Sequence, residues 1–155
     1  MTMLFRTLAT AAALVAAAPA AAQDATALNW LVGEWRGTGT MFGNPSEATL
    51  SVRPVLGGRF LELNYRAGGF EGRALYQFVD GGSWRAHWFD NRGTTFAIRG
   101  YQIEQSLRAE WGSPETEQGM TTYVIDVRGR LRVTDAVRRD GTYRDFATHV
   151  FERAE

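Results

Sequence analysis

The sequence predicts an all-β fold: a single antiparallel, up-and-down β-barrel of about ten strands, preceded by a short N-terminal helix. Apolar and polar residues alternate with period two through most of the chain after Trp35, as they do in half-buried strands. Glycine-containing turns separate the alternating segments. No segment after Asn29 carries the i, i+3, i+4, i+7 apolar spacing of an amphipathic helix.

The first 22 residues predict a secretory signal peptide. Arg6 precedes an apolar run from Leu8 to Ala18, and Ala20–Ala22 supplies an A-x-A cleavage site. An uncleaved membrane anchor is the alternative, but the apolar run is shorter than the roughly 20 residues of a spanning helix. We therefore expect residues 1–22 to be removed and residues 23–155 to form the barrel domain. The expected location is the periplasm or the outside of the cell, with no membrane span after cleavage.

Composition narrows the classes of function. The chain has 155 residues, 17 basic and 17 acidic, and every basic residue is arginine. This balance argues against a non-specific nucleic-acid binder, so no nucleic-acid partner is expected. Without cysteine there is no disulfide, thiolate metal site or cysteine nucleophile. With two histidines and no cysteine, we expect no structural metal site.

The elements follow in chain order. Residues 24–32 are apolar enough for a short helix that plugs one end of the barrel. Ten segments then predict strands, because each has apolar residues at every second position. These segments are Glu34–Met41, Ala48–Arg53, Leu61–Arg66, Phe70–Val79, Trp84–Phe89, Thr94–Tyr101, Glu104–Trp111, Met120–Val127, Leu131–Val137 and Tyr143–Glu152.

Short connections predict how the strands are joined. Turn residues that tolerate positive φ stand at Leu56–Arg59, Asp80–Gly82, Asp90–Gly93, Arg128–Gly129 and Asp140–Gly141. Connections this short fit antiparallel neighbours, because parallel strands need crossover helices for which the chain has no room. Closing the sheet into a barrel also removes two exposed edges.

The opening strand carries a family resemblance. Residues 31–39, LVGEWRGTG, resemble the Gly-x-Trp strand of the calycin superfamily, which includes lipocalins and fatty-acid-binding proteins. With Val55–Leu61 and His87–Gly93, the chain looks more closely like DUF1579-type, lipocalin-like bacterial proteins of unknown function. Nitrobindins, which are haem-carrying barrels of similar size, are a more distant likeness. The resemblance covers nearly all of residues 28–153.

The resemblance implies how the barrel closes. In calycins an arginine of the last strand commonly lies across the tryptophan of the first. Arg153 and Arg144 are the candidates here, and Arg153 is preferred because it ends the last strand. A guanidinium over an indole contributes roughly 0.5–2 kcal/mol. Gly33, Trp35 and Arg153 are therefore predicted to be structural closure residues.

The nitrobindin likeness implies one cofactor alternative. Nitrobindins hold haem iron with a histidine near the C-terminus, and His149 lies in the last predicted strand. Haem also needs a roomy apolar cavity. The favoured expectation is a histidine of the barrel wall and no cofactor, with haem on His149 as the alternative.

The face on which His87 lies is open. If Trp84 and Trp88 point inward, His87 and Arg85 point outward, and a slip of one residue reverses this. Asp90 and Arg92 are best explained as turn residues, with Asp90 capping the turn and pairing with Arg92.

Arginines recur through the first six strands and their turns: Arg53, Arg59, Arg66, Arg73, Arg85, Arg92 and Arg99. They are explained either as a solvated outer face or as one or two inward anchors for a carboxylate or phosphate. Barrels of this size hold one small ligand in an apolar pocket with few polar anchors. The candidate ligand-binding residues are Arg53, Tyr65, Tyr76, Arg85, His87, Trp88, Phe96, Arg99, Trp111 and Tyr123.

We therefore expect a binder of a small apolar or amphipathic, anionic molecule, and a binder rather than an enzyme. No catalytic residue is assigned, since the sequence has neither a Gly-x-Ser-x-Gly elbow nor a His-Glu-x-x-His motif. A calycin-type enzyme, such as an isomerase or dehydratase, is the further alternative. A pocket that holds an acid or base of shifted pKa beside an oxyanion donor would favour it.

Overall fold

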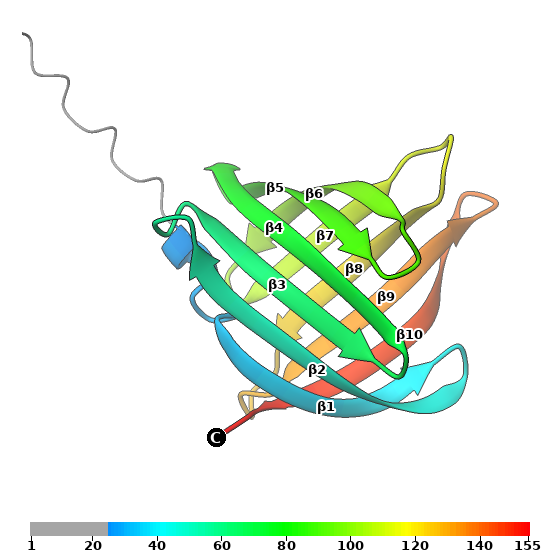
Figure 1. Ribbon diagram of the computed structural model, residues 1–155, viewed down its shortest axis with the longest axis horizontal. Coiled ribbons are helices and arrows are strands. Elements are labelled where there is room, and N and C mark those ends of the chain that lie inside the picture. Colours follow the sequence, from blue (N-terminus) through cyan, green and yellow to red (C-terminus); the bar gives the residue numbers. More distant parts are fainter. Residues whose placement is uncertain (1–24) are drawn as a thin grey trace, which may run out of the picture.

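A computed structural model describes residues 25–155 and shows ten antiparallel strands that form one closed barrel (Figure 1). The strands are β1 (Gly33–Met41), β2 (Asn44–Val55), β3 (Phe60–Ala67), β4 (Phe70–Asp80), β5 (Ser83–Asp90), β6 (Thr95–Ile103), β7 (Ser106–Gly112), β8 (Gln118–Ile125), β9 (Leu131–Arg139) and β10 (Thr142–Arg153). The predicted all-β, antiparallel barrel of ten strands is confirmed.

Each strand pairs with the strand before and after it in the chain. The barrel is closed by β1 and β10, whose register runs from Trp35 opposite Arg153 to Met41 opposite Ala147. Because the first and last strands pair, the sheet has no free edge along which another chain could add.

Several predicted strand boundaries differ from the structure, and two of them are wrong for a clear local reason. The strand predicted to begin at Glu104 begins two residues later, at Ser106, because Glu104 adopts φ 51° and forms the β6–β7 turn. The segment predicted to end at Val127 ends at Ile125, because the carboxylate of Asp126 accepts hydrogen bonds from the backbone N–H groups of Arg128 and Arg130, at 2.9 and 3.0 Å. An aspartate side chain that accepts hydrogen bonds from the backbone just after it favours a turn, so the strand ends there.

Before β1, the described chain forms one four-residue 3-10 helix, Ala25–Leu28, within the segment expected to be helical. Leu28 and Leu31 are buried in the barrel core. The predicted signal peptide, residues 1–22, lies outside the described residues. Over residues 25–155, no helix is long and apolar enough to cross a membrane.

The interior has two different ends. The closed end contains Trp35 and Phe151, together with Leu28 and Leu31. Other large buried side chains pack with them there: Leu50, Leu61, Leu63, Trp84, Leu107 and Leu131. The cavity end lies at the opposite rim, where the turns at 42–43, 68–69, 91–94, 113–117 and 140–141 join the strands.

Candidate ligand cavity

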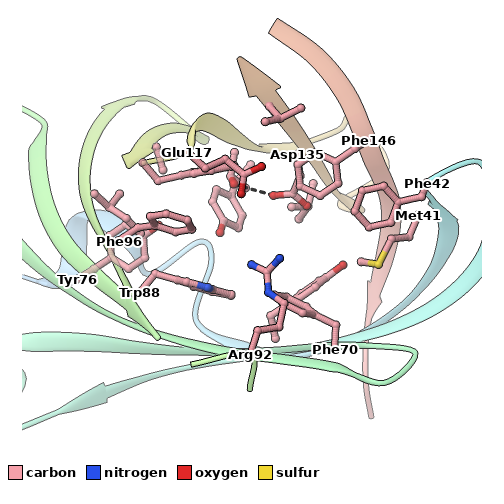
Figure 2. A pocket seen from close by; sticks show the side chains of 18 of the residues that line it. Met41, Phe42, Phe70, Tyr76, Trp88, Arg92, Phe96, Glu117, Asp135 and Phe146 are labelled. Atoms are coloured by element: carbon pink, nitrogen blue, oxygen red, sulfur yellow. Dashed lines mark hydrogen bonds between the residues drawn. The ribbon is translucent and has the colours of Figure 1, made fainter. Parts of the chain in front are cut away.

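The cavity end encloses a space of about 280 Å³. Its lining comes from every strand pair that reaches this rim and is dominated by aromatic and aliphatic side chains (Figure 2). The lining residues are Met41, Phe42, Tyr65, Phe70, Tyr76, Trp88, Arg92, Phe96, Ile98, Ala109, Trp111, Glu117, Thr121, Tyr123, Val133, Asp135, Val137, Arg139 and Phe146. A concave apolar space with few polar groups is the usual form of a small-molecule site.

Two glycines make room for two tryptophan rings of the wall. A Cβ placed on Gly72 would lie 1.8 Å from the indole of Trp88, and one on Gly119 would lie 2.0 Å from the indole of Trp111. Each ring therefore lies over the bare backbone of the neighbouring strand. Trp88 also stacks on Phe70, with centroids 6.1 Å apart, so the rings are held against the wall.

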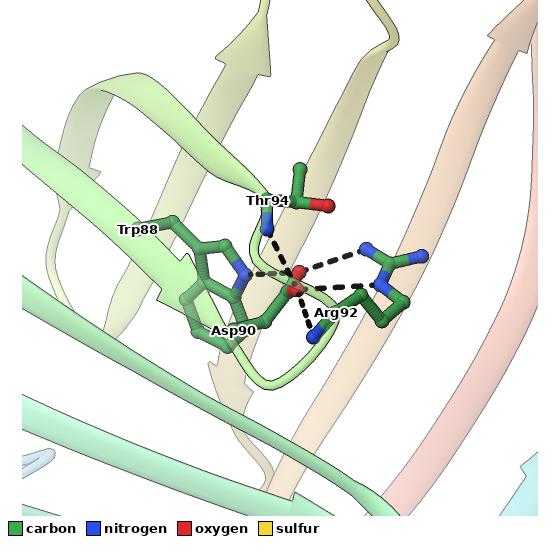
Figure 3. A network of polar contacts seen from close by, with 4 residues as sticks. All are labelled: Trp88, Asp90, Arg92 and Thr94. Carbon is green, nitrogen blue, oxygen red and sulfur yellow. Dashed lines mark hydrogen bonds and ion pairs between the residues drawn. The ribbon is translucent and has the colours of Figure 1, made fainter.

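A polar network fixes the β5–β6 turn at the cavity mouth (Figure 3). The Asp90 carboxylate pairs with the Arg92 guanidinium at 2.8 Å and accepts the Trp88 indole N–H at 3.2 Å. It also accepts the backbone N–H groups of Arg92 and Thr94. Burial opposes ionisation, but these hydrogen bonds outweigh it and hold the pKa of Asp90 below its usual value. The predicted turn role of Asp90, with Arg92 as its partner, is confirmed.

Aromatic and charged pairs complete the mouth. Phe42 and Phe146 stack with centroids 5.2 Å apart. Phe146 stands at a β-bulge of β10, where the register with β9 shifts between Asp145 and Ala147. Such a bulge re-aims a side chain that regular alternation would direct elsewhere. Arg139, at the end of β9, pairs with Glu117 at 3.1 Å.

The inner polar group is Asp135. It lies opposite Thr121 in the β8–β9 register, and the Thr121 hydroxyl donates to its carboxylate at 2.6 Å. Burial raises the pKa of Asp135 to about 6, although the Thr121 hydrogen bond works in the other direction. Burial also raises the pKa of Tyr76 and of Tyr123, and the negative charge of Asp135 adds to the shift in both. The two hydroxyls therefore stay protonated.

Six of the ten candidate ligand-binding residues line this cavity: Tyr65, Tyr76, Trp88, Phe96, Trp111 and Tyr123. The other four, Arg53, Arg85, His87 and Arg99, are exposed on the outer face of the barrel, so the structure does not bring them to the cavity. Trp84 and Ala86 are buried, which settles the register of β5 and turns Arg85 and His87 outward.

The outward arginines have structural partners. Arg53 and Arg73 both pair with the carboxylate of Glu62, a side chain only 1% exposed. Burial opposes ionisation of Glu62, yet the hydrogen bond from Arg53 and the charge of Arg73 hold its pKa below the usual value. Arg85 donates to the side-chain oxygen of Gln77 at 2.9 Å. These contacts stabilise the outer face of the sheet.

His149 points into the barrel but does not line the cavity. Its Nδ1 lies 3.2 Å from the Tyr65 hydroxyl, and its ring packs against Phe151. Its Nε2 is buried without a hydrogen-bond partner among residues 25–155, and burial lowers the pKa of the imidazole. An axial haem ligand needs open space in front of the ligating nitrogen, and Nε2 is enclosed by protein. The residues therefore do not fit the haem alternative, which stays a prediction that titration with hemin would test.

The closure residues lie together at the closed end. The guanidinium of Arg153 stands 4.3 Å from the ring centroid of Trp35. It donates to the carbonyls of Val32 and Trp30 at 2.7 and 2.9 Å, and the Trp35 indole donates to the Leu31 carbonyl at 2.9 Å. Gly33 adopts φ 141°, which strains any other residue, and a Cβ there would lie 2.5 Å from the guanidinium of Arg153. These contacts tie the N-terminal segment to the last strand.

Sequence reasoning missed four polar residues of the site: Glu117, Thr121, Asp135 and Arg139. It considered Arg92 among the arginines that could point inward but did not select it as a ligand-binding residue. For Asp135 a signal was present, because Leu131, Val133, Asp135 and Val137 occupy one face of a single strand. An acid on an otherwise apolar face marks a polar group inside a barrel. Arg92 and Glu117 lie in connections between strands, where no periodicity indicates the direction of a side chain.

No protein-family model matches this chain, and no curated protein is significantly similar to it. Within residues 25–155, no group of three or more histidine, aspartate or glutamate side chains is placed to hold a metal ion.

Proposed function

We propose that this protein is an exported, lipocalin-like barrel that binds a small apolar or amphipathic molecule in the cavity end. The observation that carries the proposal is the unfilled space of about 280 Å³, enclosed by aromatic side chains inside a closed barrel. Cores are otherwise packed with few voids larger than a water molecule. A space of this size in so small a protein is best explained by a ligand.

The lipocalin-like assignment is supported by the first strand. Its Gly-x-Trp sequence comes with an arginine of the last strand over the tryptophan, which is the closure expected from the calycin resemblance. Export rests on the sequence of residues 1–22 alone. It predicts that the mature protein begins at Gln23, which N-terminal sequencing of the secreted chain would check.

An anionic headgroup is less well supported than an apolar body. The expectation of an anion depended on inward arginines, and among the described residues the two that reach the cavity lining are Arg92 and Arg139. Each already pairs with a carboxylate, Asp90 or Glu117. The apolar body of the ligand is what the cavity supports best.

The proposal is tested with the neutral fluorescent probe N-phenyl-1-naphthylamine. Wild-type protein should enhance its fluorescence with saturation at one probe per chain. Ala109→Leu adds volume to the cavity lining and should weaken binding at least tenfold, as should Ile98→Phe, a second filling variant. Ala97→Leu makes the first change on the exposed outer face of β6 and should bind like wild type. Equal affinity in Ala109→Leu, Ile98→Phe and wild type would contradict the proposal.

One observation favours an enzyme as the second candidate. Asp135, with its pKa raised to about 6, shares an apolar cavity with the protonated hydroxyl of Tyr76. A carboxylate base beside a hydroxyl donor is the arrangement used to move a proton next to a carbonyl group. The model reaction is the base-promoted ring opening of 5-nitrobenzisoxazole, in which a base removes the ring C–H proton as the N–O bond breaks. A rate that exceeds that of free acetate and is lost in Asp135→Asn supports the enzyme, and a rate equal to acetate excludes this base.

A further inference from the structure

Asp135 is an acid placed where a barrel core would normally carry an aliphatic side chain. Its neighbours on the inner face of β9 are Val133 and Val137, and its cross-strand partner Thr121 contributes one hydrogen bond at 2.6 Å. A carboxylate has two oxygens and accepts several hydrogen bonds. Placing it in an apolar cavity with one hydroxyl partner among the described residues costs the empty protein stability, and such groups gather at functional sites.

The other charges of the cavity lining neutralise one another. Arg92 pairs with Asp90, and Arg139 pairs with Glu117. Of the charged residues in the described lining, Asp135 alone has no ion-pair partner within the described chain. The interior therefore carries one uncompensated negative charge when Asp135 is ionised. Figure 2 shows Arg92 and Asp135 extending into the cavity from opposite sides.

Aromatic rings surround the same space. Trp88 and Trp111 lie over Gly72 and Gly119, and Phe96 packs beside Trp111 with centroids 5.1 Å apart. An indole presents the most favourable face for a cation, and the attraction grows when the cation is shielded from water. A carboxylate among aromatic rings is the chemistry that recognises an organic ammonium group.

We infer that the cavity selects a compact apolar molecule that bears one protonated amine, with the ammonium group paired to Asp135 and its apolar body between the tryptophan rings. The inference rests on the proposed function and deepens it by giving the sign of the ligand's charge. It replaces the anion expected from the sequence with a cation, because the uncompensated charge inside the barrel is negative.

Three probes that share an indole body test the sign. Tryptamine is a cation, 3-methylindole is neutral and indole-3-acetate is an anion at pH 7.5. Isothermal titration calorimetry on the full mature chain should show tryptamine binding about tenfold tighter than 3-methylindole. Indole-3-acetate should bind more weakly than either, because its carboxylate would meet that of Asp135.

Two matched variants show which carboxylate causes the preference for tryptamine. Asp135→Asn keeps the size of the side chain and removes its charge, so tryptamine should lose about tenfold in affinity while 3-methylindole keeps its own. Glu117→Gln makes the same change at the cavity mouth, on a carboxylate already paired with Arg139, and should retain the preference for tryptamine. If Glu117→Gln removes the preference and Asp135→Asn keeps it, the ammonium site is at the mouth and the inference is wrong.

The pH dependence of tryptamine binding is an independent test of the pairing with Asp135. Between pH 7.5 and pH 5, protonation of Asp135 should weaken tryptamine binding about tenfold and leave 3-methylindole unchanged, since the pKa of Asp135 is about 6. Titratable and charged side chains reach the cavity or its floor from all the elements around Asp135. They are Tyr65 on β3, Tyr76 on β4, Arg92 after β5, Glu117 after β7, Tyr123 on β8, Arg139 on β9 and His149 on β10. The same titration on Asp135→Asn separates their contribution, and it should show no loss of tryptamine affinity.

The outcomes separate the two proposals. If neither the naphthylamine probe nor any indole binds, the cavity is not a ligand site and the proposed function fails. If 3-methylindole binds and tryptamine binds no tighter, or if indole-3-acetate binds tightest, the proposed function stands and the inference of a cationic ligand is overturned.

Discussion

The two ends of the barrel are built from the same alternating strands but are filled differently. At the closed end, Trp35 and Phe151 are at most 1% exposed, and the charged group nearby, Arg153, lies over the indole with its donors on backbone carbonyls. At the cavity end, the tryptophans lie flat over glycines and an acid faces an open space.

The difference shows how one strand pattern yields both a core and a site. Alternation decides which side chains point inward, while their size decides whether the interior is filled. Where large side chains meet, as Trp35 and Phe151 do, the barrel is packed. Where Gly72 and Gly119 stand beneath tryptophans, space remains. Stability is therefore concentrated at one end, and the other can carry a carboxyl in an apolar cavity at some cost in stability.

The largest expected effect is a loss of stability that differs between two tryptophan substitutions. Trp35→Ala should lower the free energy of unfolding by about 3–5 kcal/mol, because it empties a packed site. Trp111→Ala should cost clearly less, since one side of its ring already borders a cavity. Urea denaturation of both variants measures this. Equal costs would mean that the cavity end is packed as tightly as the closed end.

The next effect concerns the glycine beneath Trp88. Gly72→Ala places a Cβ 1.8 Å from the indole of Trp88 and should push the ring into the cavity. We expect a loss of about 1–3 kcal/mol in the free energy of unfolding and weaker binding of the naphthylamine probe. Gly69→Ala is the matched control, because a Cβ there meets nothing within 4 Å. Thermal unfolding and probe titration report both quantities. Normal probe affinity in Gly72→Ala would contradict the role given to this glycine.

A smaller effect comes from the buried acid. Since the pKa of Asp135 is raised to about 6 in the folded state, its protonation stabilises the fold at low pH, and this stabilisation is lost as the pH rises through about 6. Asp135→Asn should therefore raise the free energy of unfolding at pH 8 by about 1–2 kcal/mol, because it removes a buried charge.

At pH 5 that gain should shrink by about 1 kcal/mol. Burial lowers the pKa of His149, so protonation of this histidine destabilises the fold as the pH falls. This loss should be the same in wild type and in Asp135→Asn. Denaturation at the two pH values gives the comparison. A gain that is the same at pH 8 and pH 5 would show that Asp135 titrates normally.

The smallest effect lies at the cavity mouth. Phe42 adopts φ 50° in the β1–β2 turn, a conformation that costs about 1 kcal/mol or more for a residue of this kind, and the residue is 71% exposed. Phe42→Asn suits the turn better and should gain up to about 1 kcal/mol, while the probe should dissociate faster without the Phe42–Phe146 pair. Stopped-flow release checks the second effect. A less stable variant would show that the aromatic stack outweighs the backbone strain.

Local patterns predicted most of the fold and six of the nineteen residues that line the cavity. Alternation alone grouped Tyr65 and Tyr76 with the apolar residues of their strands, since alternation is a property of one strand. It left the face of Arg85 and His87 open until the neighbouring strands fixed the register. The bulge that turns Phe146 to the mouth depends on pairing between β9 and β10, which no single segment encodes. The charge of the site was missed because Asp135 looks like any surface acid until its strand face is read with its apolar neighbours.

Both proposals require that the space between the rings of the cavity end is open while the closed end is full. A crystal of the mature protein held under xenon pressure tests this most directly. Xenon should bind beside Trp88 and Trp111, and should be absent from the packed interior around Trp35 and Phe151. Side chains that fill the cavity end, with no xenon in either half, would contradict the account.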